Sequence, residues 1–137
     1  MTIESNLEKI ERLTAKVWRV SKSHDPLAHL SFNEYDYLKS IQLSKKSIRL
    51  TDLALEMNVS KPSASNMVKR LECKELVEVV NCSDDARVKR VRLTAKAEQS
   101  LLSEIEIYKT IATKLCCKLN SNEKKQLDSL LTKAFRQ

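Results

Sequence analysis

One stretch, residues 50 to 73, constrains the fold more than any other part of the chain. A short apolar-periodic segment around Leu53 predicts a helix, and Asn58 follows it, where a tight turn needs a residue that tolerates a positive φ. Ser60 is a good N-cap for a second helix, and Pro62 is acceptable in the first turn of that helix. The sequence therefore predicts two helices joined by a tight turn.

Two strand patterns follow this helix pair. Residues 76 to 80 have strand propensity, residues 81 to 86 form a polar turn region, and residues 88 to 93 alternate apolar and basic side chains. Helix, tight turn, second helix and two-stranded hairpin is the element order of a winged helix-turn-helix. The second helix of that motif fits the major groove of DNA. We therefore expect a winged helix-turn-helix lobe over residues 31 to 94.

Helical patterns flank this lobe on both sides. Apolar residues recur every three or four positions over residues 3 to 22 and again after Thr94, where a long helix precedes a last helix that begins at Ser121. The pair Asp25-Pro26 predicts a break before a capping box that starts at Ser31. The predicted fold class is mainly α with a small β-hairpin wing (α+β), a winged helix-turn-helix with N- and C-terminal dimerisation helices.

We expect a single domain that spans residues 1 to 137. The outer helices of this domain, at residues 3 to 22 and 95 to 137, lie outside its winged lobe. Their apolar stripes would leave a large exposed apolar surface, which packing against a second copy of the chain would cover. A two-fold homodimer would hold two recognition helices about 34 Å apart, one turn of DNA. Six residues are the dimer candidates, with intrachain core as the alternative role for each: Leu7, Ile10, Val17, Leu127, Leu130 and Leu131.

The second helix of the motif has two distinct faces. At about 100° per residue, Ala64, Met67, Val68 and Leu71 cluster on the side that must pack on the domain. The opposite face is small, polar and basic, with no carboxylate before Glu72, as suits a helix that meets bases and phosphates. A solvated surface face is the alternative. The DNA-binding candidates here are Ser60, Lys61, Pro62, Ser63, Ser65, Asn66, Lys69 and Arg70.

The second strand pattern carries four cations in six residues, from Arg87 to Arg92. A wing with this charge would lie along the DNA backbone or place an arginine in the minor groove, although a hairpin that is basic only for solubility is the alternative. The wing candidates are Arg87, Lys89 and Arg90. Asp85 is placed to form an ion pair that holds the turn through Arg87.

The charge of the whole chain agrees with a polyanionic partner. The formal net charge is +7, and residues 61 to 94 and 95 to 137 each carry eight basic and five acidic residues. A basic protein is attracted to nucleic acid whether or not it reads sequence. No apolar run approaches the roughly 20 residues of a membrane span, and the N-terminus shows no secretion signal. We therefore expect double-stranded DNA as the partner, no membrane, and a cytoplasmic location.

Several chemistries lack their usual residues. The four cysteines Cys73, Cys82, Cys116 and Cys117 have no C-x-x-C spacing, and no histidine follows His29, so we expect no metal and no cofactor. Free thiols are the expectation, with Cys82 the most exposed candidate for oxidation. The sequence has no Gly-rich phosphate loop and no Cys-His-Asp constellation, which argues against an enzyme.

Residues 31 to 97 resemble the MarR family. The family pattern is matched at Leu53-Ala54, Val59-Ser60-Lys61, Arg70-Leu71-Glu72, Leu76-Val77, Asp85-Ala86-Arg87 and Leu93-Thr94. The resemblance implies a homodimer that represses or activates promoters. It also implies that a ligand relieves this repression or activation. The chain contains no glycine, and Glu75 and Ala97 stand where the family has one. Because a left-handed non-Gly residue costs about 1 kcal/mol, we expect the turn before Leu76 to be reshaped.

The effector is an expectation from this resemblance: a small aromatic or amphipathic molecule. Four aromatic residues are candidates to line its pocket, with a core role as the alternative: Trp18, Tyr35, Tyr37 and Tyr108. Two other functions stay open. One is an iron- or manganese-dependent repressor, because the Tyr37-Leu38-Lys39 segment is similar to the helix-turn-helix of that family. A metal site in this chain would have only His24 and His29 as imidazole ligands. The other is a non-DNA-binding protein that antagonises a regulator.

Overall fold

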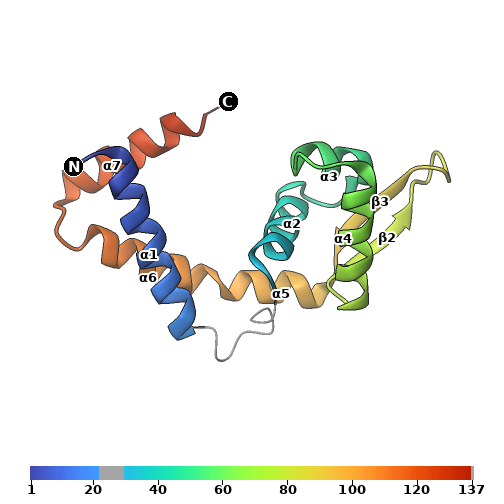
Figure 1. Ribbon diagram of the computed structural model, residues 1–137, viewed down its shortest axis with the longest axis horizontal. Helices are drawn as coiled ribbons and strands as arrows, with labels where there is room; N and C mark the ends of the chain where they lie inside the picture. Colours follow the sequence, from blue (N-terminus) through green and yellow to red (C-terminus); the bar gives the residue numbers. More distant parts are fainter. Residues whose placement is uncertain (22–29, 137) are drawn as a thin grey trace. The chain divides into compact units, whose positions relative to one another are not determined.

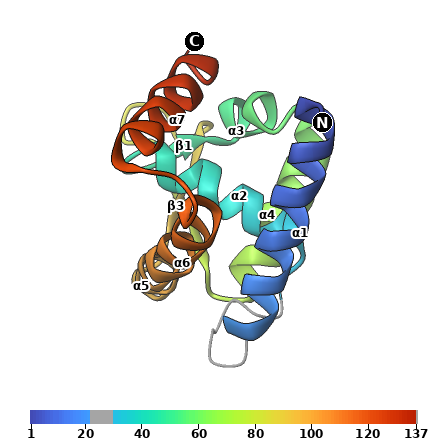
Figure 2. The ribbon, with the colours of Figure 1, turned by 90° about the vertical axis from the view of Figure 1, so that its left-hand side faces the viewer.

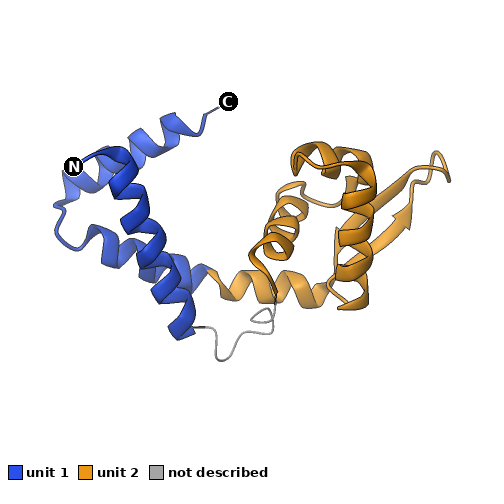
Figure 3. Cartoon of the chain, viewed as in Figure 1, with its two compact units in different colours: residues 1–23, 105–137 blue, residues 24–104 orange. Residues whose placement is uncertain are grey.

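The computed structural model describes residues 1–21 and 30–136. The chain divides into two compact units, coloured separately in Figure 3. One contains Met1–Ser23 and Ile105–Gln137, and the other contains His24–Glu104. The predicted break at Asp25-Pro26 lies outside the described residues. The boundary before Ile105 places residues 95–104 in the second unit, so this unit ends ten residues later than the lobe expected from the sequence.

The second unit, here called the winged unit, contains four helices and three strands among its described residues (Figure 1). They are α2 (Phe32–Leu43), β1 (Ile48–Arg49), α3 (Leu50–Glu56), α4 (Lys61–Cys73), β2 (Val77–Asn81), β3 (Lys89–Leu93) and α5 (Ala95–Ser103). The predicted order of helix, turn, helix and hairpin is present. The predicted fold class, mainly helical with a small β-sheet, is confirmed.

The wing has one strand more than predicted. Its antiparallel sheet has the order β1-β3-β2, with Ile48 opposite Val91 on one side and Val79 opposite Val91 on the other. Strand β1 is only two residues long, so no alternation of apolar and polar side chains could reveal it in the sequence. Its pairing with β3 joins the helix-turn-helix to the wing in one sheet.

A single apolar core holds the winged unit together. Its largest fully buried aliphatic side chains are Leu38 and Ile41 from α2, Leu53 from α3, Leu71 from α4, and Val77 and Val91 from the sheet. Each helix of the motif and both long strands therefore contribute at least one side chain that no water reaches. Burial of each such side chain contributes about 1.5–3 kcal/mol, so the position of α4 on the unit is set by this core.

Three turns of the described chain use a left-handed residue that is not glycine. Asn58 has φ 56°, as predicted, and Lys45 has φ 75°. Glu75 has φ 61°, and the Leu76 amide donates to the carbonyl of Leu71 at 3.0 Å, which closes the end of α4. The expectation that this turn would be reshaped is wrong. The chain keeps the left-handed geometry and accepts its cost of about 1 kcal/mol.

The other unit contains three helices among its described residues: α1 (Ile3–Ser21), α6 (Ile105–Cys116) and α7 (Ser121–Ala134). Helix α1 packs on α6 through Val17, Ile107 and Ile111. Helix α7 follows α6 through a turn at residues 117–120 (Figure 2). The long helix predicted after Thr94 is interrupted at Glu104, which caps the C-terminus of α5.

Candidate nucleic-acid interface

Helix α4 is fixed to the winged unit by the face that its sequence pattern predicted. Ala64, Met67, Val68 and Leu71 are all buried, and none is more than 9% exposed. The helix begins at the predicted cap, where the Ser60 hydroxyl oxygen accepts a hydrogen bond from the Ser63 amide at 3.3 Å. This cap satisfies one of the unpaired amides at the helix N-terminus and fixes where the first turn starts.

The opposite face of α4 is open. Seven of its eight candidate residues are exposed, and Ser65 is half-buried. Within residues 1–21 and 30–136, the side chains of Asn66, Lys69 and Arg70 make no hydrogen bond or ion pair. An unpaired amide beside two unpaired cations can donate to bases and phosphates without first breaking an internal contact.

The tip of the wing is held by backbone contacts. The Asp85 carboxylate accepts a hydrogen bond from the backbone amide of Arg87 at 2.9 Å, and the Cys82 amide donates to the carbonyl of Val88 at 2.9 Å. The ion pair expected between Asp85 and the Arg87 side chain is absent from the described residues. Arg87 and Lys89 are therefore exposed cations on a turn whose backbone is defined.

The other two wing cations have partners within the chain. Arg90 is half-buried, and its Nε donates to the Ser47 hydroxyl at 2.8 Å while its Nη2 donates to the Ser47 carbonyl at 3.3 Å. The Arg92 Nε lies 2.8 Å from a carboxylate oxygen of Glu78 on the neighbouring strand. Of the three wing candidates, Arg90 thus differs from Arg87 and Lys89. Its guanidinium already has a partner that the sequence could not reveal.

An ion pair between an exposed lysine and a buried carboxylate supports the far end of α4. The Lys74 ammonium, one residue beyond the helix, lies 2.6 Å from the Glu34 carboxylate of α2. Glu34 is only 6% exposed and also completes the predicted capping box with Ser31. Burial raises the pKa of Glu34, but the hydrogen bonds and charge of Lys74 together with the Ser31 amide outweigh burial and hold this pKa below its ordinary value. The carboxylate therefore stays ionised and anchors α4 to α2.

The four aromatic residues predicted to line an effector pocket belong to two different units, two residues to each. Tyr37 is 2% exposed and belongs to the core of the winged unit, and Tyr35 is half-buried there with its hydroxyl donating to Glu104. Trp18 and Tyr108 belong to the other unit, where their rings meet edge-to-face with centroids 6.2 Å apart. Tyr37 is thus a core residue, which was the alternative role.

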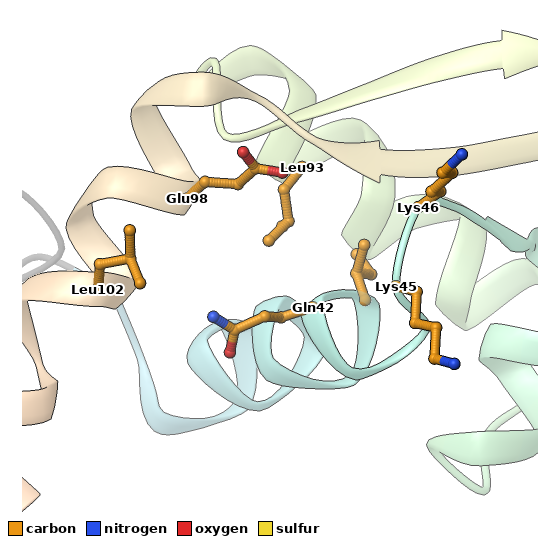
Figure 4. Close-up of a pocket in the computed structure, with 7 residues that line it drawn as sticks. Gln42, Lys45, Lys46, Leu93, Glu98 and Leu102 are labelled. Atoms are coloured by element: carbon orange, nitrogen blue, oxygen red, sulfur yellow. The ribbon is translucent and has the colours of Figure 1, made fainter.

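A pocket of about 250 Å³ lies elsewhere in the winged unit, between α2, the turn that follows α2, the end of β3 and α5. Figure 4 shows Gln42, Glu98 and Leu102 around this space, with the Lys45 and Lys46 side chains extending away from it. Apolar and polar groups share its walls, and none of the four predicted aromatic residues lines it. The residues lining it are Ile41, Gln42, Lys45, Lys46, Leu93, Glu98 and Leu102.

The dimer candidates divide by exposure. Leu7, Leu130 and Leu131 are 58%, 65% and 47% exposed, and Ile10 and Leu127 are half-buried. Val17 is 4% exposed because Ile107 and Ile111 of its own chain cover it. Val17 is therefore an intrachain core residue, which was the alternative role. Helix α7 has no fully buried residue in the described chain.

No described region offers a metal site. Within the described ranges, no three His, Cys, Asp or Glu side chains gather closely enough to hold a metal ion, and His24 and His29 lie outside those ranges. The four cysteines are free thiols, with Cys73 and Cys117 exposed and Cys82 and Cys116 half-buried. The expectation that Cys82 is the most exposed of them is therefore wrong, because the wing hairpin covers part of its side chain. Across the described helices, none is long and apolar enough to cross a membrane.

A family model matches part of this chain: residues 30–89 match the model of the MarR family. Over this segment the chain is similar to that family. The full chain also has the fold of solved MarR proteins. Wild-type apo MarR from E. coli superposes with a TM-score of 0.70 at 20% identity, covering 99% of this chain and 98% of that one.

Two further structures are similar to the chain. A mutant MarR from E. coli complexed with operator DNA has a TM-score of 0.65 at 21% identity, covering 98% of this chain and 94% of that one. Bordetella bronchiseptica BpsR, whose DNA binding is regulated by 6-hydroxynicotinic acid, has a TM-score of 0.66 at 16% identity, covering 98% of each chain. At these identities the likeness establishes the fold, and the predicted MarR-type winged helix is confirmed.

Proposed function

We propose that this protein is a homodimeric, sequence-specific transcription regulator that acts in the cytoplasm. Helix α4 reads the major groove of a near-palindromic operator, and wing residues 81–92 meet the backbone or the minor groove. The observation that carries this proposal is the open face of α4, where Asn66, Lys69 and Arg70 are exposed and unpaired within the described chain. The similar E. coli structure with operator DNA supports it.

The surface chemistry of α4 favours base reading over charge attraction alone. Small side chains at Ser63 and Ser65 let the helix approach the groove, and Asn66 can donate to and accept from adenine in a bidentate pair. Lys61, Lys69 and Arg70 provide cations for phosphates around this amide. The DNA contacts that we propose are therefore Ser60 to Ser63, Ser65, Asn66, Lys69, Arg70, Arg87 and Lys89.

We propose a two-fold dimer through the outward apolar side chains of α1 and α7. Leu7, Leu130 and Leu131 are large apolar residues exposed to water in the isolated chain. Burying such side chains against a second copy would favour association at about 25 cal/mol per Å² of apolar surface. Ile10 and Leu127 lie half-buried on the same helices and would complete the interface. A two-fold axis would present two α4 helices to successive major grooves.

We propose that a small amphipathic molecule modulates DNA binding from the pocket of about 250 Å³. The pocket combines the apolar side chains of Ile41, Leu93 and Leu102 with the polar groups of Gln42 and Glu98. A ligand there would touch the residue at the end of the wing strand β3. The regulation of BpsR by 6-hydroxynicotinic acid supports this kind of effector and makes that compound a suitable first probe.

The decisive experiment is selection of bound duplexes from random and genomic DNA, followed by mobility shifts at two salt concentrations. A regulator should retain a preference for the selected duplex over competitor DNA at moderate salt, because base contacts are less salt-dependent than phosphate contacts. Binding without any preference would reject sequence reading, and no binding at all would favour the antagonist. Binding that requires added Fe²⁺ or Mn²⁺ would favour the metal-dependent repressor.

A further inference from the structure

The four cations of the wing form two classes in the structure. Arg87 and Lys89 are exposed, and their side chains have no hydrogen bond or ion pair within the described residues. Arg90 and Arg92 each reach sideways from β3, Arg90 to Ser47 before β1 and Arg92 to Glu78 on β2. The central strand of the sheet therefore directs one arginine to each neighbour.

The contact of Arg90 matters more than that of Arg92. The Arg92–Glu78 pair has both side chains about half exposed, 52% and 51%, and exposed pairs contribute little because water competes for them. Arg90 is half-buried and donates two hydrogen bonds to one residue, to its hydroxyl at 2.8 Å and its carbonyl at 3.3 Å. Because the guanidinium is rigid and planar, two hydrogen bonds from it to the same residue fix its orientation.

Strand β1 is the element that depends on this contact. It has two residues and is the edge of the sheet, where Ile48 and Arg49 pair with β3 alone. A strand this short has few backbone hydrogen bonds of its own, so a side-chain contact beside it adds a substantial share of its attachment. Ser47 immediately precedes β1 and follows the left-handed turn at Lys45, so holding Ser47 determines where β1 begins.

We propose that Arg90 is a positioning residue for the wing and not a contact to DNA phosphate. Its guanidinium fastens β3 to Ser47, holds β1 at the edge of the sheet, and thereby keeps the turn with Arg87 and Lys89 in the orientation that meets DNA. The proposal rests on the proposed DNA-binding function for its binding readout. Its structural half, the attachment of β1, holds independently of DNA.

The test compares salt dependence among four variants bound to a duplex selected by the wild-type protein. Arg90→Ala and Ser47→Ala should each weaken binding, by about fivefold for the loss of a hydrogen-bonded contact, while the slope of log K against log salt stays that of wild type. The double variant should bind no more weakly than Arg90→Ala, because both changes remove the same contact. Lys89→Ala is the matched control, and its slope should flatten by about one unit if that residue meets a phosphate.

A slope that flattens in Arg90→Ala, with Ser47→Ala binding as tightly as wild type, would overturn the proposal. Arg90→Lys adds a second criterion. It keeps the charge but has no planar fork to grip both oxygens of Ser47, so it should resemble Arg90→Ala. Full recovery of affinity in Arg90→Lys would show that charge alone is needed and would reject the positioning role.

Amide hydrogen exchange on the free protein separates this proposal from the proposed function. The β1 amides and those of residues 82–88 should exchange faster in Arg90→Ala and Ser47→Ala than in wild type, while the α4 amides stay protected. Unchanged exchange in both variants would refute the positioning role even if DNA binding falls. If the wild-type protein binds no DNA, the proposed DNA-binding function is wrong. The exchange data still decide whether Arg90 holds β1 in place.

Discussion

At the scale of single residues, this chain builds left-handed turns without glycine. Lys45, Asn58 and Glu75 all have positive φ among the described residues. Asparagine is the cheapest of the three, because its short polar side chain hydrogen-bonds locally, whereas Glu75 carries the full steric cost of a Cβ. The end of α4 keeps its geometry because hydrogen bonds after Leu71 and the buried side chain of Leu76 require it.

Glu75→Gly should therefore stabilise the protein. Removing the Cβ from a residue at φ 61° relieves about 1 kcal/mol, less the extra entropy of glycine in the unfolded chain, for a net gain of roughly 0.3–0.8 kcal/mol. Urea unfolding measures this change. Glu72→Gly is the control, because Glu72 is an exposed residue inside α4, and glycine there should cost about 1 kcal/mol. Equal destabilisation by both changes would contradict the account of the turn.

The Glu34–Lys74 pair makes stability depend on pH. The pKa of Glu34 is lowered in the folded state, so the pair's contribution is present above the unfolded pKa, near 4.5, and is lost as pH falls through the folded value. Lys74→Met should reduce the free energy of unfolding at pH 7 by roughly 1–3 kcal/mol, because it leaves a buried carboxylate without its cation.

Thermal or urea unfolding from pH 7 to pH 2.5 measures this effect. The difference between wild type and Lys74→Met should shrink steadily below about pH 4.5, as the Glu34 carboxylate becomes protonated in both proteins. Lys109→Met is the matched control, because its partner Glu106 is 77% exposed and the pair should contribute almost nothing. A difference that stays constant down to pH 2.5 would show that lost packing, not charge, explains the variant.

At the scale of elements, α4 combines a buried face and an open face set by the same helical period. Its apolar face is fixed by Leu71 and its neighbours in the core, so the direction of the open face follows from the packing of the winged unit. Asn66 and Lys69 are one turn apart on that open face. An amide and an ammonium differ in what they can recognise, so the two residues should contribute differently to DNA binding.

Asn66→Ala and Lys69→Ala should separate base reading from phosphate binding. Asn66→Ala should lower affinity for the selected duplex by about 1–3 kcal/mol, with little change for non-specific DNA and no change in salt slope. Lys69→Ala should weaken binding to all duplexes alike and flatten the slope by about one unit. Fluorescence anisotropy on both duplexes measures each quantity. A loss of affinity in Asn66→Ala that is equal on both duplexes would exclude a base contact.

At the scale of the whole molecule, the described residues of helices α1 and α7 leave large apolar side chains exposed. Helix α7 has no buried residue in the described chain, and Leu130 is 65% exposed. Val17 shows the opposite outcome, because α6 of the same chain covers it. The same kind of apolar stripe therefore serves as intrachain core in one place, and in another it stays exposed where we propose that a second copy binds.

Leu130→Asp should convert the proposed dimer to a monomer. A charge at this position cannot be buried in an apolar interface without a cost of several kcal/mol. Sedimentation equilibrium should then give the mass of one chain, 15.7 kDa, and affinity for a two-half-site operator should fall with the loss of the paired helices. Leu43→Asp is the control, because Leu43 is 78% exposed on the winged unit and should leave the dimer intact. A wild-type chain that sediments as a monomer would reject the proposed dimer.

Local features were predictable from the sequence because they depend on residues within about four positions. The caps at Ser31 and Ser60, the positive φ at Asn58, and the buried face of α4 all follow from neighbouring residues and the helical period, and all four are confirmed. The MarR pattern was visible for the same reason. Its motifs are short and lie close together in the lobe that the family model matches.

Only the tertiary structure decided which distant residues meet. Arg90 and Ser47 are 43 positions apart, and Glu34 and Lys74 are 40 apart, so no periodicity links either pair. Strand β1 exists because β3 lies beside it, and Val17 is buried because α6 covers it. The sequence by itself thus determined the helix-turn-helix pair, its cap at Ser60 and the open face of α4. Packing decided which basic side chains stay open to a partner, because a hydrogen bond to a distant residue removes a cation from the surface and no local pattern encodes that choice.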